Sequence, residues 1–128
     1  MQLHGAGAYP EVQKALALME GWNPSWSAPA PGPNSQYYFY YATQAKFNAG
    51  GAPWAKWNET MTKEYVAAQR VVPAERSGYA DADGNPQEVG WWENGDTSTD
   101  RPVLDTCLAA LQLMVYYRYS PATQGETP

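Results

Sequence analysis

Aspartate, cysteine and histidine are residue types that can hold a metal or transfer protons. Asp105 and Cys107 lie two positions apart near the start of an apolar run, and both side chain types can ligate zinc. A catalytic zinc site needs a third protein ligand, and the only histidine, His4, lies in an N-terminal segment that we expect to be mobile. We therefore favour a buried, inert Cys107 thiol on the apolar face of a helix. We predict no bound metal and no other cofactor.

A second group of oxygen ligands has the alternating spacing that suits calcium. Asp81, Asp83 and Asn85 follow one another at every second position. Pro86, however, occupies the position where an EF-hand loop needs glycine, and Trp92 occupies its closing position. We therefore interpret this segment as a solvated turn.

Other catalytic and nucleotide-binding patterns are not supported by the sequence. A Ser/His or Cys/His pair would have to use His4, and no surrounding residues support that role. Gly5-Ala6-Gly7 is followed by Pro10 where a dinucleotide-binding loop places its third glycine. Gly50-Gly51 lacks the Gly-Lys pair of a phosphate-binding loop.

Composition narrows the class of protein further. The chain has 128 residues, which we assign to a single domain or fragment covering 1–128. Aromatic residues make up 14% of it and charged residues only 16%, against roughly 25% in typical globular chains, so we expect extensive burial, in part between chains. The net charge of -5, with scattered basic residues, argues against nucleic acid as a partner. No apolar run approaches the roughly 20 residues of a membrane span. Localisation cannot be read from the sequence.

Apolar periodicity predicts an all-α fold with about four main helices joined by long Pro/Gly-rich loops. We place the helices at 10–21, 35–49, 53–70 and 101–119. The helix at 35–49 is aromatic on most sides and needs neighbours on several of them. Residues 71–100 are predicted to form a long loop held by a tryptophan, and the tail 121–128 is expected to be disordered. The phase of the apolar stripes predicts a buried set that comprises Tyr41, Phe47, Trp57, Leu108, Leu111 and Val115.

The segments YYFYYATQAKFNAGG, PWAKWNETMTKEYVAAQ, GWW and TCLAALQLMVYYRY resemble the prenyltransferase and squalene-oxidase repeat family, over roughly residues 35–120. In that family a helix ends in glutamine and a Gly-x-Trp sequence leads to the next helix, which resembles Gln69 followed by Gly90-Trp91-Trp92. The resemblance implies helical hairpins that form an α/α toroid. A closed toroid of this kind needs about a dozen helices, so at ordinary helix lengths this chain supplies an arc, similar to the C-terminal portion of bacterial members.

The same resemblance bears on catalysis. The family's cyclases use an Asp-x-Asp-Asp acid, whereas this chain has Asp81-Ala82-Asp83-Gly84 with glycine at the last position. Asp105 and Cys107 match the Asp-x-Cys zinc pair of protein prenyltransferases, which also requires a distant histidine. We therefore expect a non-catalytic scaffold or interaction module.

Two alternative functions remain open. The chain can be part of an isoprenoid cyclase-like or prenyltransferase-like enzyme whose cavity is completed by another chain or by further sequence, with a hydrophobic small molecule as ligand. It can also be a carbohydrate-binding module. Either ligand would meet an aromatic surface that comprises Tyr37, Tyr38, Tyr41, Trp54, Trp91 and Trp92.

An arc of helices leaves apolar faces exposed, and a second copy of the chain can cover them. We therefore expect a homo-oligomer, specifically a dimer, or association with the remainder of a longer toroid.

Overall fold

The computed structural model describes residues 6–26, 35–93 and 101–115 and is mostly helical, as the sequence predicts. Its elements in chain order are η2 (Ala6–Ala8, a 3₁₀ turn), α1 (Pro10–Leu18), α2 (Ser35–Ala49), α3 (Gly51–Ala68), β1 (Arg70–Val72), α4 (Ala74–Ser77), β2 (Val89–Trp91) and α5 (Arg101–Leu113). His4, the predicted helix end at 116–119 and the tail 121–128 lie outside the described residues. Within those residues, no helix is long and apolar enough to cross a membrane.

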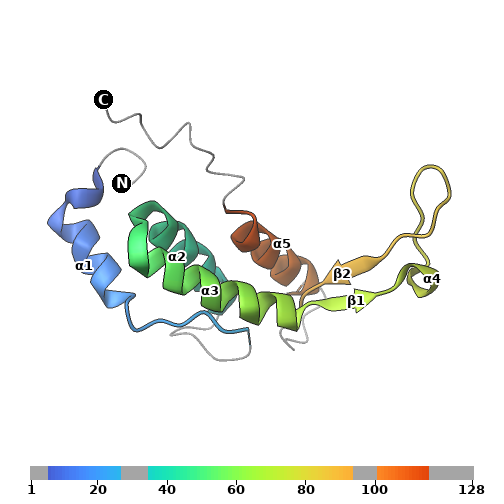
Figure 1. Ribbon diagram of the computed structural model, residues 1–128, viewed down its shortest axis with the longest axis horizontal. Coiled ribbons are helices and arrows are strands. Elements are labelled where there is room, and N and C mark those ends of the chain that lie inside the picture. Colours follow the sequence, from blue (N-terminus) through green and yellow to red (C-terminus); the bar gives the residue numbers. More distant parts are fainter. Residues whose placement is uncertain (1–5, 27–34, 94–100, 116–128) are drawn as a thin grey trace.

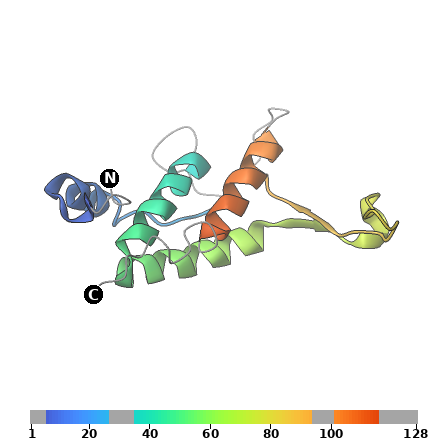
Figure 2. The same ribbon diagram turned by 90° about the horizontal axis from the view of Figure 1, so that it is seen from above.

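Three helices form the body of the protein. α2 and α5 lie side by side and run in the same direction, and both lie on one side of the longer α3 (Figures 1 and 2). α2 packs against both of the other two helices. α2 and α3 meet at a sharp corner where Gly50 and Gly51 have φ angles of 68° and 60°. Only glycine adopts this left-handed conformation without strain, so the two residues fix the corner.

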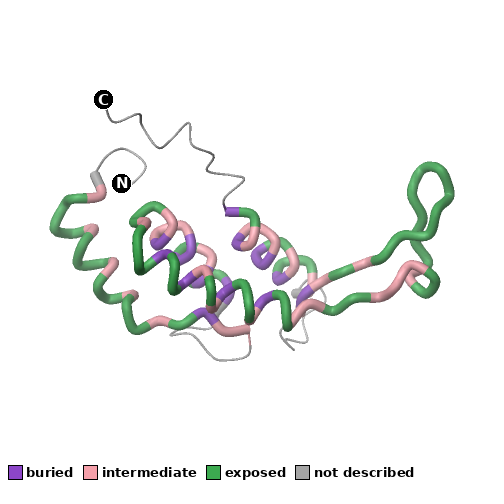
Figure 3. The backbone as a smooth tube through the Cα atoms, viewed as in Figure 1, coloured by how far each residue is buried: buried purple, intermediate pink, exposed green. Residues whose placement is uncertain are grey.

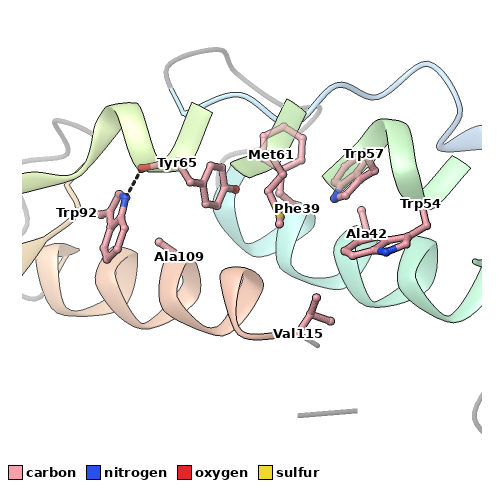
Figure 4. Packing of buried hydrophobic residues seen from close by; sticks show 9 residues of the cluster. All are labelled: Phe39, Ala42, Trp54, Trp57, Met61, Tyr65, Trp92, Ala109 and Val115. Atoms are coloured by element: carbon pink, nitrogen blue, oxygen red, sulfur yellow. Dashed lines mark hydrogen bonds between the residues drawn. The ribbon is translucent and has the colours of Figure 1, made fainter. Parts of the chain in front are cut away.

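The apolar core lies between these three helices and includes the indole of Trp92 (Figures 3 and 4). Trp57, Leu108 and Val115 are buried, which confirms the prediction for these positions. Phe47 and Leu111 are only half-buried. The prediction for Tyr41 is wrong, because its side chain is 53% exposed. α2 turns Phe39, Ala42, Thr43 and Lys46 inward, and Tyr41 lies on the opposite side of the helix.

A buried hydrogen-bond network joins the three helices. The Tyr65 hydroxyl on α3 donates to Gln36 Oε1 on α2 at 2.5 Å and lies 3.1 Å from Gln112 Oε1 on α5. Thr43 donates to the same Gln112 oxygen at 3.1 Å and accepts a hydrogen bond from Trp57 Nε1 at 2.9 Å. All five side chains are buried, so each bond replaces a contact with water that folding has removed.

Burial also keeps the Tyr65 hydroxyl of this network protonated. Removal of water raises the pKa of the Tyr65 hydroxyl well above its ordinary value, the hydrogen bond with Gln112 lowers it, and the charge of Asp105 raises it again. Tyr65 is therefore a neutral donor at physiological pH.

The connection after α1 is held against this core. Trp22 and Trp26 are half-buried and pack on the core cluster. Trp26 stacks edge to face on Tyr65 with ring centroids 5.2 Å apart, and its indole N–H donates to the Glu93 carbonyl at 3.1 Å. The side chain of Gln36 donates to the Trp26 carbonyl at 3.4 Å. The network thus extends to the segment before α2.

The prediction of a continuous loop at 71–100 is wrong in its described part, because a two-stranded ribbon extends from the end of α3 (Figure 1). β1 and β2 are antiparallel, with Arg70 opposite Trp91 and Val72 opposite Val89. Strands of three residues leave no periodic pattern in a sequence, which explains the error. The ribbon and α4 point away from the helices, and no residue from 70 to 91 is buried.

The tryptophan that follows the ribbon anchors it to the body. Trp92 is buried, and its indole N–H donates to the Tyr65 carbonyl near the end of α3 at 2.7 Å (Figure 4). Its backbone N–H donates to the Thr106 hydroxyl on α5 at 3.0 Å. The side chain of Gln69 lies directly against Gly90, where a Cβ atom would be 2.6 Å from Gln69 Nε2. Trp92 therefore covers the junction between α3 and α5.

We expect Tyr65→Phe to lower the free energy of unfolding by about 1–3 kcal/mol, because it removes the hydroxyl that donates to the buried oxygen of Gln36. Denaturant unfolding followed by circular dichroism measures this change. Tyr79→Phe is the matched control: Tyr79 is 67% exposed on the ribbon, and its loss should fall within about 0.5 kcal/mol of zero. Equal losses in the two variants would contradict a structural role for the network.

Candidate interaction surface

Large apolar side chains are exposed on both α2 and α5. Of the eleven such exposed residues in the described parts of the chain, three lie on α2, two on α5 and one directly after the end of α5. They are Tyr37, Tyr38, Tyr41, Val103, Leu104 and Met114. Cys107 is also exposed on α5. We call these seven residues the α2/α5 surface.

Charge is distributed very unevenly over the helices. Within residues 36–49 and 102–115 the only charged side chains are Lys46 and Asp105, and both are buried. The exposed parts of α2 and α5 in these ranges therefore carry no charge. α3, in contrast, exposes Lys56, Glu59 and Lys63, with an ion pair of 2.6 Å between Lys63 and Glu59. The outer side of α3 is thus a typical solvated helix face, and the α2/α5 surface is not.

The tyrosines of α2 form an ordered group. Tyr37 and Tyr41 pack edge to face with ring centroids 5.0 Å apart, and their hydroxyl oxygens are 3.3 Å apart. Tyr40 and Tyr41 pack in the same way at 5.1 Å. The hydrogen bond with Tyr37 raises the pKa of Tyr41 above its ordinary value of 10.0. Tyr41 is therefore neutral at physiological pH, and the three rings present apolar edges and hydroxyl groups to the surroundings.

The tryptophans that the sequence grouped with these tyrosines do not join them. Trp54 and Trp92 are core residues, so their assignment to a ligand-binding surface is wrong. Trp54 packs edge to face on Phe47 at 5.2 Å. Trp91 lies on β2 and is half-buried, with its indole N–H donating to Glu93 at 3.2 Å. Of the six predicted aromatic residues, only Tyr37, Tyr38 and Tyr41 are exposed on one helix.

Asp105 and Cys107, the two candidate zinc ligands, lie on different sides of α5. Asp105 is fully buried, whereas Cys107 is exposed. Residues two positions apart on a helix lie on nearly opposite sides, so only one of the two can face the core. The expectation of a buried thiol is therefore wrong. Among the described residues, no group of three or more His, Cys, Asp or Glu side chains is placed to hold a metal ion.

Asp81 and Asn85 close a turn at the tip of the ribbon. Asp81 Oδ1 accepts hydrogen bonds from the backbone N–H groups of Asp83 at 3.0 Å and Asn85 at 2.9 Å. Asp81 Oδ2 accepts from the side-chain amides of Asn85 and Gln87, both at 3.1 Å. Both carboxylate oxygens thus have partners within the chain, which favours the solvated turn over a calcium site.

The exposure of Leu104 and Met114 was missed from the sequence. The apolar residues of the predicted helix at 101–119 were all expected to face a core, whereas the structure exposes four of them. The expected set was Val103, Leu104, Cys107, Leu108, Leu111, Met114 and Val115, and the exposed ones are Val103, Leu104, Cys107 and Met114. Such a set spans too much of a helix circumference to face one neighbour, because an apolar stripe that meets one core is only slightly wider than 100°. The width of the apolar arc on this helix was therefore the sequence signal that some of its apolar residues are exposed.

No protein-family model, curated protein or solved structure matches the chain. The assignment of a function therefore rests on the geometry of the described residues.

We expect the Asp81 carboxyl to have a pKa below its ordinary value of 3.8, because the backbone N–H and then the side chain of Asn85 stabilise its ionised form. A lowered pKa means that the turn is stabilised when Asp81 is ionised and loses this contribution as the pH falls through the folded-state pKa. Carboxyl-carbon NMR titration measures it directly.

Asn85→Ala should raise the pKa of Asp81 only part of the way, since the backbone donors remain. Asn58→Ala, on α3, is the control and should leave it unchanged. A pKa at or above 3.8 in the unmodified chain would contradict the turn geometry.

Proposed function

We propose that this chain is a non-catalytic helical interaction module that pairs with a second copy of itself through the α2/α5 surface. The observation that carries the proposal is the absence of exposed charge within residues 36–49 and 102–115 of the described chain, next to a charged α3. Charged residues are depleted at the centres of protein interfaces, and aromatic residues and methionine are enriched there. The α2/α5 surface has both properties.

A second copy is the partner that suits this surface best. The overall charge of -5 would repel another copy wherever acidic groups face each other, and an uncharged surface is the place where two copies can meet without repulsion. A two-fold contact uses the same residues on both copies. A stable dimer of this kind buries on the order of 2,000 Å² or more in total.

The layering of the helices supports the finer proposal of a toroid arc. α2 and α5 run in the same direction in one layer, and α3 lies against them in another (Figure 2). In an α/α toroid, helices of one layer repeat in this manner, and the next helices would cover the exposed sides of α2 and α5. A second copy would take the place of those missing helices.

Two further observations favour a non-catalytic role over the alternative of an enzyme fragment. Asp81, the best match to a cyclase acid, is fully exposed in a turn, where no apolar chamber raises its pKa. Asp105 and Cys107 lie on different sides of α5. Neither Asp81 nor the pair of Asp105 and Cys107 is therefore arranged for the chemistry that the family resemblance suggests.

We expect Leu104→Lys to abolish self-association, because it places an ammonium group at the centre of an apolar contact. Thr62→Lys, which adds the same charge to an exposed position on α3, should leave association intact. Size-exclusion chromatography with light scattering at a fixed micromolar concentration measures the mass of each variant. Thermal unfolding confirms that both are folded.

Three results would contradict the proposal. The first is an unmodified chain that is a monomer at micromolar concentration. The second is a Leu104→Lys variant that associates as well as the unmodified chain. The third is an equal loss of association in both lysine variants. The third result would indicate that an added positive charge prevents self-association wherever on the chain it is placed.

A further inference from the structure

Two adjoining cavities lie on the other side of the molecule from the ribbon, where α1 and the connection after it approach the corner between α2 and α3. Their volumes are about 310 Å³ and 470 Å³. Glu20, Lys46 and Pro53 line both of them, so the two cavities share a wall. None of the α1 residues is buried, and Leu16 and Ala17 on this helix line the larger cavity.

Lys46 is the unusual residue of this site. Its side chain is only 4% exposed, and it is the single buried lysine in the described residues. The ion pairs within those residues join Lys63 to Glu59 and Arg70 to Glu93, and neither involves Lys46. Most of the side chain is held within the fold, and Lys46 lines both cavities, so its ammonium group opens to them. An anion bound there would supply the counter-ion that the described residues do not provide.

The start of α3 faces the same space. Gly50 and Gly51 line the larger cavity and Ala52 the smaller one. The first N–H groups of a helix have no partner within the helix, and the aligned peptide dipoles give this end a partial positive charge. α3 has no acidic residue in its first turn and no side-chain cap. Gly51 and Ala52, the first two residues of this 18-residue helix, therefore supply its free N–H groups beside the cavities that Lys46 lines, because Pro53 has no N–H.

The other groups around the cavities define what kind of molecule fits. Leu16, Trp22, Pro24 and Trp57 supply apolar walls. Lys56 and Glu20 are the remaining charged residues in the lining; both are exposed, and their charges oppose each other. The buried part of the site therefore combines one positive charge with apolar walls.

We propose that these cavities bind a small molecule with a carboxylate or phosphate group on an apolar body. Lys46 supplies the counter-ion, and the first N–H groups of α3 donate hydrogen bonds to the anionic oxygens. The apolar body lies against α1 and the tryptophans of the neighbouring connection. The two volumes are in the range of pockets for small ligands.

The test uses four probes on the full chain: octanoate and octyl phosphate have both features, and inorganic phosphate has only the charge. Octanol, which has only the apolar body, is the fourth. We expect octanoate or octyl phosphate to shift the backbone amide signals of Gly51 and Ala52 saturably in NMR spectra. Octanol and inorganic phosphate should bind at least tenfold more weakly.

Lys46→Met keeps the length of the side chain and removes its charge. We expect it to weaken binding of the anionic probe at least tenfold and to leave binding of octanol unchanged. Lys63→Met, at an exposed lysine on α3, is the matched control and should bind as the unmodified chain does. Lys46→Met should also retain self-association, which separates this site from the α2/α5 surface.

Several outcomes would overturn the proposal. They are octanol binding as tightly as octanoate, Lys46→Met binding as tightly as the unmodified chain, and anion-induced shifts that map away from Gly51 and Ala52. If Lys46→Met fails to fold, the amide shifts of the unmodified chain decide. No saturable shift with either octyl anion would reject the site, whatever the oligomeric state.

Discussion

The position of the Tyr65 hydroxyl constrains the whole structure. It is fully buried on α3 and can be satisfied only by groups on α2 and α5, which supply Gln36 and Gln112. Apolar contacts tolerate small sliding of one helix along another, whereas a buried hydrogen bond is lost within about an ångström of displacement. The network therefore fixes the register of three helices at once. Trp92, which donates to the carbonyl of the same tyrosine, fixes the position of the ribbon relative to them.

Sequence periodicity was sufficient to locate the main helices but not to orient them. A capping side chain at Asn34 or Ser35 and the glycines Gly50 and Gly51 in the sequence predicted the bounds of α2 at 35–49, because these signals are local. The inward face of α2 could not be identified in this way, since aromatic residues occur on most sides of it. What decides that face is the polar residues Gln36 and Thr43, whose partners lie 29 and 69 positions away in the sequence. Long-range polar pairing of this kind leaves no periodic signal.

The sequence predicted only some of the residues of the candidate interaction surface correctly. Tyr37, Tyr38 and Tyr41 are exposed, as a binding role requires, but Trp54 and Trp92 are needed in the core. The core of a small domain can accommodate only a limited apolar volume, and here the indoles of Trp54, Trp57 and Trp92 occupy much of it. The exposed aliphatic side of α5 follows from the same limit. We infer that the unusually low charge content of the chain reflects this surface, since a surface reserved for a partner has no need of solvated charges.

The reactivity of Cys107 tests the central claim most directly, because this thiol lies within the α2/α5 surface and is exposed in a single copy. The rate of its reaction with a maleimide is measured over a dilution series. Pairing through α2 and α5 predicts a rate that falls as the protein concentration rises. A thiol introduced by Thr62→Cys in a Cys107→Ser background should react at one rate throughout. A Cys107 rate independent of concentration, in a chain that associates, would show that the copies meet through a different surface and would contradict the account.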